Sequence, residues 1–260
     1  MLQFSANLSM LFTEVPLLER FALARQQGFN ALEIQFPYEL SIDAIRQQLE
    51  QNQQQLVLIN APAGNLMQGG DGLACVPGRE YEFRQAVFHA IHYASALSVP
   101  CINILAGRQS TFADLLPCLE TMANNLRFAC NEMTKADITP VFEIINGIDM
   151  PRFLIQTMAQ AQEMLEAVNH PALKIQFDCY HLAMMHEPIL PNLQENLAHI
   201  GHIQFADYPN RHEPGTGELN FHDIFAFIQQ SNYQGFVGAE YRPLSTTSAS
   251  LHWYQPFIQQ

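Results

Sequence analysis

The amino-acid sequence predicts an α/β protein built as a (β/α)8 barrel. Eight short apolar runs alternate with longer segments in which apolar residues recur every three to four positions, as strands followed by amphipathic helices do. A length of 260 residues matches the usual size of such a barrel. No linker rich in proline, glycine or serine divides the chain, so we expect a single (β/α)8 domain over residues 1–260.

The expected strands follow one another at regular spacing. In chain order their runs are LQFSANL, ALEIQF, LVLIN, CINILA, TPVFEII, LKIQFD, HIQFA and FVGAEY. The first three helices are expected in PLLERFALARQQ, which ends at Gly28, in SIDAIRQQLEQN, which begins with a capping serine, and in REYEFRQAVFHAIHYASAL, after a Pro-Gly turn. A doubly wound sheet would alternate similarly, but no GxGxxG follows the first run, which favours the barrel.

The charge and the cysteines restrict the partners and the compartment. Twenty-five acidic residues against twelve basic ones give a formal charge of −13, which would repel nucleic acid and anionic membranes, so we expect neither as a partner. No apolar run could span a bilayer and the first residues do not resemble a signal peptide. The five cysteines include no CxxC pair, which fits a reducing compartment. We therefore expect a cytoplasmic protein.

Polar residues occur late in the apolar runs. The carboxyl ends of the strands form the active face of a (β/α)8 barrel, so these residues are candidates for the site. Any one of them alone would more often form a turn or cap a helix. They are Asn7, Glu33, Asn60, Asn103, Glu143, Asp178, Gln204 and Glu240.

The last four of these residues predict a metal site. They come from consecutive strands, and the three carboxylates among them would repel one another unless a cation neutralised them. Three carboxylates and the amide carbonyl of Gln204 form an all-oxygen set that suits Mg²⁺ or Mn²⁺ better than zinc. His181, three positions after Asp178, should face the same mouth and support a ligand or contact the substrate.

Six stretches carry a resemblance to a known family. They are FSANLSMLF (4–12), EIQFPY (33–38), CVPGREYEFR (75–84), LKIQFDCYH (173–181), GHIQFADYPNRHEPGTGELNF (201–221) and GFVGAEYRP (235–243). Together they resemble the hydroxypyruvate isomerase family, which belongs to the xylose-isomerase-like TIM barrels. Two positions depart from the family pattern, since Ile144 stands where proline is common and Tyr208 where asparagine is frequent.

The resemblance implies a set of site residues. One divalent metal would be held at Glu143, Asp178, Gln204 and Glu240, with Glu143 and Glu240 also acting as the acid–base pair. No nucleotide cofactor is implied. For the substrate carboxylate, the candidates are Arg211 and His212 in the loop after the seventh strand. The remaining candidates for substrate contact are His181, Asn7 and Glu33.

The reaction implied by the resemblance converts hydroxypyruvate to 2-hydroxy-3-oxopropanoate (tartronate semialdehyde), a step of glyoxylate metabolism by analogy. Mg²⁺ or Mn²⁺ would stabilise the enediolate while the two glutamates move protons between C3 and C2. The order in which the glutamates act and the oligomeric state stay open, and a homo-oligomer is compatible with the sequence.

Three alternatives compete with this interpretation. An isomerase of 2-oxo-tetronate, or a related sugar-acid isomerase or epimerase of the same barrel family, would share most of these motifs. An assay on both acids separates the 2-oxo-tetronate isomerase from a hydroxypyruvate isomerase. A metal-dependent endonuclease for abasic DNA would need more histidine ligands and a basic groove, which the sequence does not offer. A barrel that only binds a sugar acid would not need two glutamates placed for proton transfer.

Overall fold

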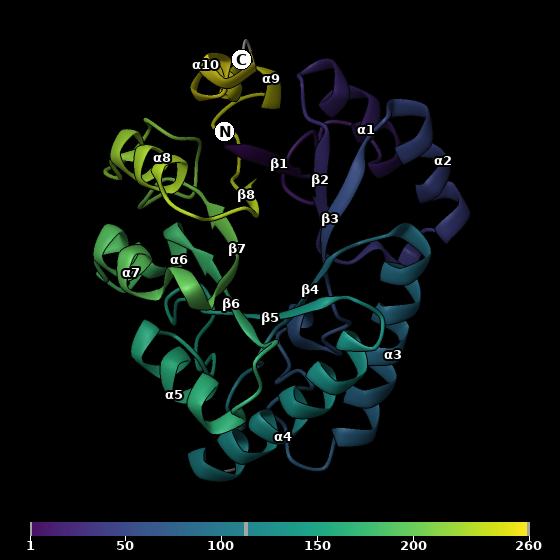
Figure 1. Ribbon diagram of the computed structural model, residues 1–260, viewed down its shortest axis with the longest axis vertical. Coiled ribbons are helices and arrows are strands. Elements are labelled where there is room, and N and C mark those ends of the chain that lie inside the picture. The colour runs from purple at the N-terminus through teal and green to yellow at the C-terminus, as the bar shows by residue number, and fades with distance from the viewer. Residues whose placement is uncertain (1, 112–113, 259–260) are drawn as a thin grey trace.

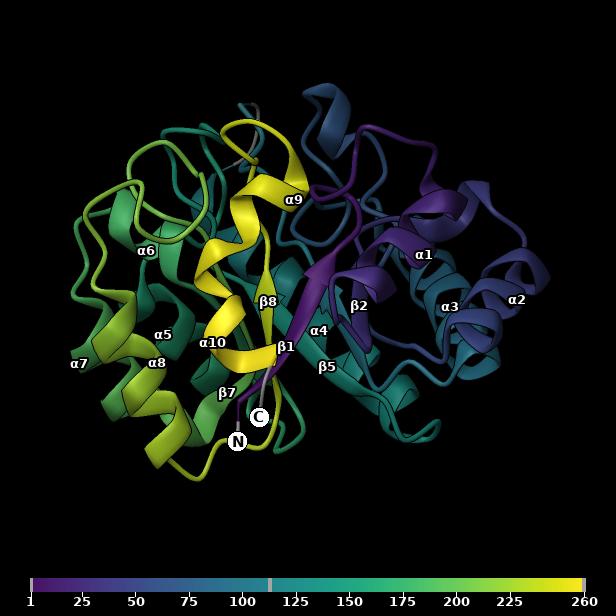
Figure 2. The same cartoon turned by 90° about the horizontal axis from the view of Figure 1, so that it is seen from above.

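The computed structural model describes residues 2–111 and 114–258. Eight parallel strands close into a barrel in chain order, β1 to β8, and the helices surround it (Figures 1 and 2). The closed parallel sheet confirms the predicted (β/α)8 barrel. Of the helices in these two ranges, none combines the length and apolarity needed to cross a bilayer.

Each strand overlaps the apolar run that predicted it. Helices cover the outside of the sheet and side chains fill its inside, so the strands are buried on both faces and read as nearly continuous apolar sequence. The strands are β1 (Gln3–Asn7), β2 (Ala31–Ile34), β3 (Gln55–Asn60), β4 (Cys101–Ile104), β5 (Thr139–Glu143), β6 (Lys174–Asp178), β7 (Ile200–Phe205) and β8 (Phe236–Ala239).

The three helices predicted in detail are confirmed. Ser41 caps the second by accepting a hydrogen bond from Ala44 N at 3.2 Å, and Gly28, with a φ of +94°, follows the first. The helices are α1 (Leu17–Gln26), α2 (Ile42–Asn52), α3 (Glu80–Leu97), α4 (Leu115–Thr134), α5 (Met158–Val168), α6 (Cys179–Met184), α7 (Ile189–Asn196), α8 (Phe221–Gln230), α9 (Thr247–Ser250) and α10 (Gln255–Ile258), with 3₁₀ turns η1 (Pro37–Glu39), η2 (Leu66–Gln68), η3 (Leu197–His199) and η4 (Leu251–Trp253).

A polar network occupies the inside of the barrel between β1, β2 and β7. The fully buried Glu33 carboxylate accepts hydrogen bonds from Ser5 Oγ (2.6 Å), Asn7 Nδ2 (3.3 Å) and Gln204 Nε2 (2.7 Å), and lies 2.8 Å from His202 Nε2. Burial alone would raise the pKa of Glu33, but the His202 ring and the bonds from Ser5 and Gln204 hold it below its usual value. This carboxylate is therefore a satisfied anion.

Gly238 in β8 leaves the space that this carboxylate fills. A methyl group on Gly238 would overlap Glu33 Oε1, and the surrounding hydrogen bonds prevent the carboxylate from moving away. We expect Gly238→Ala to lower the free energy of unfolding by roughly 1–3 kcal/mol, the usual cost of overpacking. Thermal denaturation measures it. In a Glu33→Ala background, Gly238→Ala should lower the free energy of unfolding much less. An equal loss in both backgrounds would show that the Glu33 carboxylate does not obstruct the methyl group.

An aromatic cluster joins the two ends of the described chain. Phe4 of β1 packs edge-on against Trp253, Tyr254 and Phe257, with ring centroids 5.2, 5.8 and 4.9 Å away. Figure 2 shows α9 and α10 beside β1 and β8. The segment after β8 therefore covers the junction at which the last strand pairs with the first.

Candidate active site

A small cavity of about 80 Å³ opens at the carboxyl ends of the strands. Glu143 at the end of β5 and Glu240 directly after β8 both line it, so two of the predicted carboxylates meet there. Asp178 does not line the cavity; it is fully buried beside His181, with its Oδ2 3.9 Å from His181 Nε2. The other polar lining residues are Gln35, Asn60, Asp149, His181 and Arg211, and the apolar ones are Phe36, Met67, Leu105, Ile145 and Met150.

Three of these side chains could hold a metal ion. Glu143, Asp178 and His181 present ligand atoms within 4.8 Å of one another, and His181 Nε2 lies 3.9 Å from both Glu143 Oε1 and Asp178 Oδ2. Asp178 caps α6, because its Oδ1 accepts a hydrogen bond from Tyr180 N at 2.7 Å. Its buried Oδ2 accepts no hydrogen bond from the described residues, and a cation would satisfy it.

Burial makes the carboxyls of this site weak acids. It raises the pKa of Glu143 well above the usual value, and the nearby Glu240 and Asp178 raise it further. Burial also raises the pKa of Glu240 to about 8 although Arg211 opposes the shift. The pKa of Asp178 is raised in the same way, again against Arg211. Carboxyls tuned upward in this manner can take and return protons near neutral pH.

The loop after β7 brings a cation to the cavity. Asp207 organises this loop by accepting hydrogen bonds from the backbone N–H groups of Gly215 (2.9 Å), Gly217 (2.8 Å) and Leu219 (3.1 Å). Arg211 has a φ of +59°, a strained backbone for a residue other than glycine. The loop therefore holds Arg211 in a conformation that the residue would not adopt by itself.

The guanidinium of Arg211 lies among the carboxyls. Its Nη2 is 3.6 Å from Glu240 Oε1, its central carbon is 5.1 Å from the Tyr180 ring centroid, and its buried Nε donates to none of the described groups. A buried N–H without an acceptor can serve a ligand. Burial, with Arg211 nearby, also lowers the pKa of His181 well below its usual value, so that ring is neutral.

Other predicted site residues lie away from the cavity. Gln204 Oε1 accepts a hydrogen bond from Gln176 Nε2 at 2.6 Å while its Nε2 bonds Glu33, so both ends of its amide are occupied inside the barrel. Glu33 and Asn7 belong to the same interior network. His212 Nδ1 lies 2.7 Å from Arg242 O, outside the cavity lining. The roles expected of these four residues stay predictions.

The structure also brings residues to the cavity that the sequence did not indicate. Gln35 Nε2 donates a hydrogen bond to Glu240 Oε1. Gln35 stands two positions beyond Glu33, on the same side of the extended chain, and that spacing was an available signal. Asn146 and Asp149, in the loop after β5, contact the site through hydrogen bonds to His181 and Tyr180.

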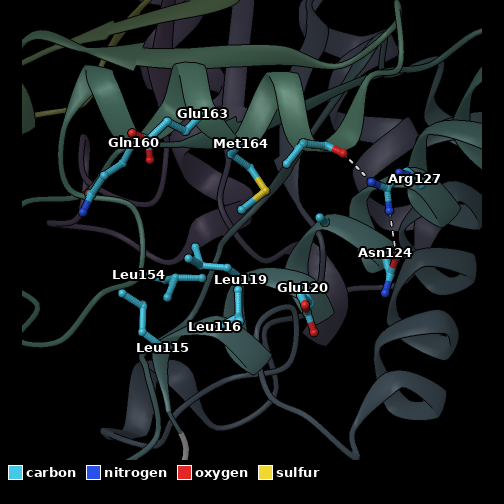
Figure 3. A pocket seen from close by; sticks show the side chains of 12 residues that line it. Leu115, Leu116, Leu119, Glu120, Asn124, Arg127, Leu154, Gln160, Glu163 and Met164 are labelled. Atoms are coloured by element: carbon cyan, nitrogen blue, oxygen red, sulfur yellow. Dashed lines mark hydrogen bonds between the residues drawn. The ribbon is translucent and has the colours of Figure 1, made fainter.

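A larger cavity of about 590 Å³ lies outside the barrel, between α4 and α5 (Figure 3). Leu115, Leu116 and Met164 give it an apolar wall. The guanidinium of Arg127 at one end is occupied by Val168 O at 3.1 Å and Asn124 Oδ1 at 2.7 Å. This cavity contains none of the clustered carboxyls, so the smaller one at the strand ends is the candidate active site.

The fold and the site define a barrel protein whose carboxyl-end cavity combines two buried glutamates of raised pKa, side chains close enough to hold a metal ion, and an arginine. The family model described as "Xylose isomerase-like TIM barrel" matches residues 21–257. The chain belongs to that family.

Full-length relatives give the reaction class. The chain is 43% identical to the hydroxypyruvate isomerase of Escherichia coli (strain K12) over 99% of its length and 100% of the relative's. It is 39% identical to the 2-oxo-tetronate isomerase of Cupriavidus necator, with 98% of each chain covered. These relatives confirm the resemblance seen in the sequence and identify the chain as an isomerase.

Solved structures share the whole fold. A crystal structure titled as an AP endonuclease of family 2 from Brucella melitensis superposes with a TM-score of 0.95, at 37% identity and 99% coverage of both chains. The 3-keto-D-glucoside 4-epimerase of E. coli superposes with a TM-score of 0.83 at 18% identity, covering 100% of this chain and 99% of that one. The second likeness shows the fold alone.

Proposed function

We propose that the chain converts hydroxypyruvate to 2-hydroxy-3-oxopropanoate, as a reaction of glyoxylate metabolism. The observation that carries the proposal is the pair of buried glutamates, Glu143 and Glu240, with raised pKa values in one cavity with Arg211. The cavity of about 80 Å³ is suited to a small acid. The 43% identical hydroxypyruvate isomerase supports this choice of acid.

The proposal includes one divalent cation, Mg²⁺ or Mn²⁺, held by Glu143, Asp178 and Glu240. The donor set fits it, because three buried carboxylates need a counter-charge and Asp178 Oδ2 accepts no hydrogen bond from the described residues. Gln204 would join them if its Oε1 left Gln176. When bound, such a cation stabilises negative charge that develops on a substrate oxygen.

The side chains divide the remaining work. Arg211 would pair with the substrate carboxylate, and apolar walls such as Phe36 and Leu105 limit access of water. One glutamate removes a proton from C3, which gives an enediol form of the substrate. The other then delivers a proton to C2 while the hydroxyl proton moves from the C3 oxygen to the C2 oxygen. Carbonyl and hydroxyl have thereby exchanged carbons without an external oxidant or reductant.

Removing the arginine should weaken substrate binding. We expect Arg211→Ala to raise KM for hydroxypyruvate by about 10- to 100-fold, because a charged hydrogen bond contributes roughly 1.5–3 kcal/mol. Arg211→Lys should recover only part of this loss, since the planar fork is absent. Arg242→Ala, which removes an exposed arginine from the neighbouring loop, is the matched control. Steady-state kinetics measure the KM values of the three variants. An unchanged KM in Arg211→Ala would show that Arg211 does not bind the substrate carboxylate.

A direct test of the function follows both acids under identical conditions. A ¹H NMR time course of purified protein with Mg²⁺ in D₂O should show hydroxypyruvate consumed and 2-hydroxy-3-oxopropanoate formed. The second candidate is 2-oxo-tetronate, the acid named for the C. necator relative at 39% identity. The higher identity to the hydroxypyruvate isomerase favours the shorter acid, so kcat/KM should be higher for hydroxypyruvate. A higher value for 2-oxo-tetronate would reverse the assignment.

The endonuclease title of the B. melitensis structure suggests another activity for comparison. Within the described ranges, the one group of three or more His, Cys, Asp or Glu side chains close enough to share a metal contains a single histidine. That set and the formal charge of −13 favour a small acid over DNA. We expect no cleavage of an abasic duplex under conditions in which hydroxypyruvate turns over.

A further inference from the structure

Asn146, in the loop after β5, lies against the imidazole of His181. Its Oδ1 accepts hydrogen bonds from the backbone N–H groups of Ile148 (3.1 Å) and Asp149 (2.7 Å). Its Nδ2 therefore faces the other way, 2.7 Å from His181 Nδ1 and 3.1 Å from Asp149 Oδ2. Every hydrogen-bonding position of this fully buried amide is used. Turning the amide over would place its NH₂ against two N–H donors, so the orientation is fixed.

This orientation determines the tautomer of the ring. An NH₂ group can only donate, so His181 Nδ1 must accept and cannot carry a proton. An imidazole without a proton on Nδ1 carries its proton on Nε2. That nitrogen belongs to a cavity-lining side chain and lies 3.9 Å from both Glu143 Oε1 and Asp178 Oδ2. The N–H bond is thus available to a group in the cavity, whereas a metal would need the bare nitrogen.

We propose that Asn146 is a positioning residue that holds His181 in the Nε2–H tautomer, so that the ring donates a hydrogen bond to a substrate oxygen instead of ligating the cation. The substrate part of this inference rests on the proposed function, whereas the tautomer does not. His181 then leaves the group of three metal ligands that its distances alone would allow. The cation keeps carboxylate ligands, which suit a hard ion.

The same amide connects the histidine to the arginine. Asp149 Oδ2, which accepts from Asn146, also accepts a hydrogen bond from Tyr180 OH at 2.8 Å. The ring of Tyr180 lies 5.1 Å from the guanidinium centre of Arg211. The two donors proposed to contact the substrate are therefore connected by one chain of side-chain contacts, which runs through Asn146, Asp149 and Tyr180.

NMR of protein labelled with ¹⁵N-histidine tests the tautomer directly. Long-range ¹H–¹⁵N spectra distinguish a nitrogen that bears a proton from one that does not, and His181→Gln identifies the ring by loss of its signals. In the metal-free wild type we expect Nε2 to bear the proton and Nδ1 to be bare. A proton on Nδ1 would overturn the proposal.

Replacing the NH₂ donor of Asn146 by an acceptor should change which nitrogen of His181 bears the proton. Asn146→Asp keeps an oxygen for the backbone N–H groups of residues 148 and 149 but places a second oxygen against both His181 Nδ1 and Asp149 Oδ2. The Asn146 backbone N–H still lies 3.5 Å from Nδ1, so a proton should appear on Nδ1 in part of the population. Asn60→Asp is the matched control, because it introduces the same charge close to the site, where Asn60 lines the cavity and hydrogen-bonds Asn103. If Asn146→Asp does not fold, Asn146→Ser keeps a hydroxyl acceptor for the turn and removes the donor, and signals of both tautomers should appear. If Nδ1 of His181 bears no proton in the folded variants, as in the wild type, the proposed role of Asn146 is contradicted.

Adding Mg²⁺ alone, and then tartronate with Mg²⁺, distinguishes whether His181 Nε2 ligates the cation or donates a hydrogen bond to the substrate. Mg²⁺ alone should leave its proton in place, and loss of that proton would make His181 a ligand. Tartronate, an unreactive hydroxy acid of similar size, added with Mg²⁺ should shift the Nε2–H resonance, and no shift at saturation would refute donation to the substrate. Neither readout needs turnover. A protein inactive on hydroxypyruvate would therefore refute the proposed function without altering the tautomer result.

Discussion

Replacing Glu143 or Glu240 by glutamine should lower kcat by at least about 10²-fold, because general acid–base catalysis alone typically contributes that much and the amide cannot exchange a proton in this way. Above about pH 8, where these carboxyls ionise, glutamine also removes one of several repelling charges, so there the metal-free variants should unfold at a higher temperature than the wild type. Loss of activity would then not result from unfolding. Glu213→Gln changes another buried glutamate outside the cavity lining and should keep kcat within a few-fold.

Proton exchange can assign the two roles. In D₂O, a glutamate that holds the abstracted proton can exchange it with solvent, so the product should carry deuterium at C2. A variant that fails to turn over but still exchanges the C3 protons of the substrate lacks the group that protonates C2, and the other glutamate is then the base. Direct hydride transfer between carbons would leave C2 without deuterium. Deuterium-free product together with a second bound metal would contradict the proposed acid–base route.

The metal-free protein should lose stability as the pH rises from about 6.5 to about 8.5. The pKa of Glu240 is raised from its ordinary value of 4.5 to about 8 in the folded protein. The protonated carboxyl therefore adds its full contribution to the free energy of unfolding below pH 4.5, and this contribution is lost as the pH rises through about 8. The raised pKa values of Glu143 and Asp178 act in the same direction. The lowered pKa of His181 acts oppositely, but only below the ordinary value of 6.5. The chosen window therefore isolates the carboxyls.

The expected size of this effect is large for one site. Each pKa unit corresponds to about 1.4 kcal/mol, so Glu240 alone should remove about 2 kcal/mol across the window and lower Tm by roughly 5 °C. Saturating Mg²⁺ should reverse the slope, because a cation binds the deprotonated carboxylates and competes with protons. Thermal melts at several pH values, with and without Mg²⁺, measure both slopes. Glu240→Gln should flatten the metal-free slope, and Asp178→Asn should reduce the stabilisation by Mg²⁺.

A metal-free Tm that stays constant or rises with pH through this window would mean that the clustered carboxyls do not titrate as weak acids. An unchanged response to Mg²⁺ in Asp178→Asn would separately remove Asp178 from the cation site. The two results are independent, since the first concerns protons and the second concerns the metal.

The strands could be located from sequence because strands covered on both faces must be apolar nearly throughout. The ends of β5, β6 and β8 were also predictable, since a carboxylate interrupts or directly follows each apolar run. These features are local. They required no knowledge of how far one strand is shifted along its neighbour.

The depth of each polar side chain in the barrel was not predictable. The register shifts between Leu32 and Glu33 where β2 pairs with β3, and between Ile175 and Gln176 where β6 pairs with β7. Such shifts depend on closure of the whole barrel and leave no local pattern. Glu33 lies in the interior network, whereas Gln35, two positions further along the same side of the chain, reaches the cavity. Asn146 was missed for a related reason, because its partner lies 35 positions further along the chain.

The pairing of β1 with β8 has a consequence for how the chain folds during synthesis. Strand β1 leaves the ribosome first, but Phe236–Ala239 and the aromatic residues that cover Phe4 are made more than two hundred residues later. Until then one edge of β1 has no strand to pair with, and unpaired edges promote aggregation. Closure of the barrel must therefore be a late event, and nascent chains halted before β8 should depend on chaperones more than the completed protein does.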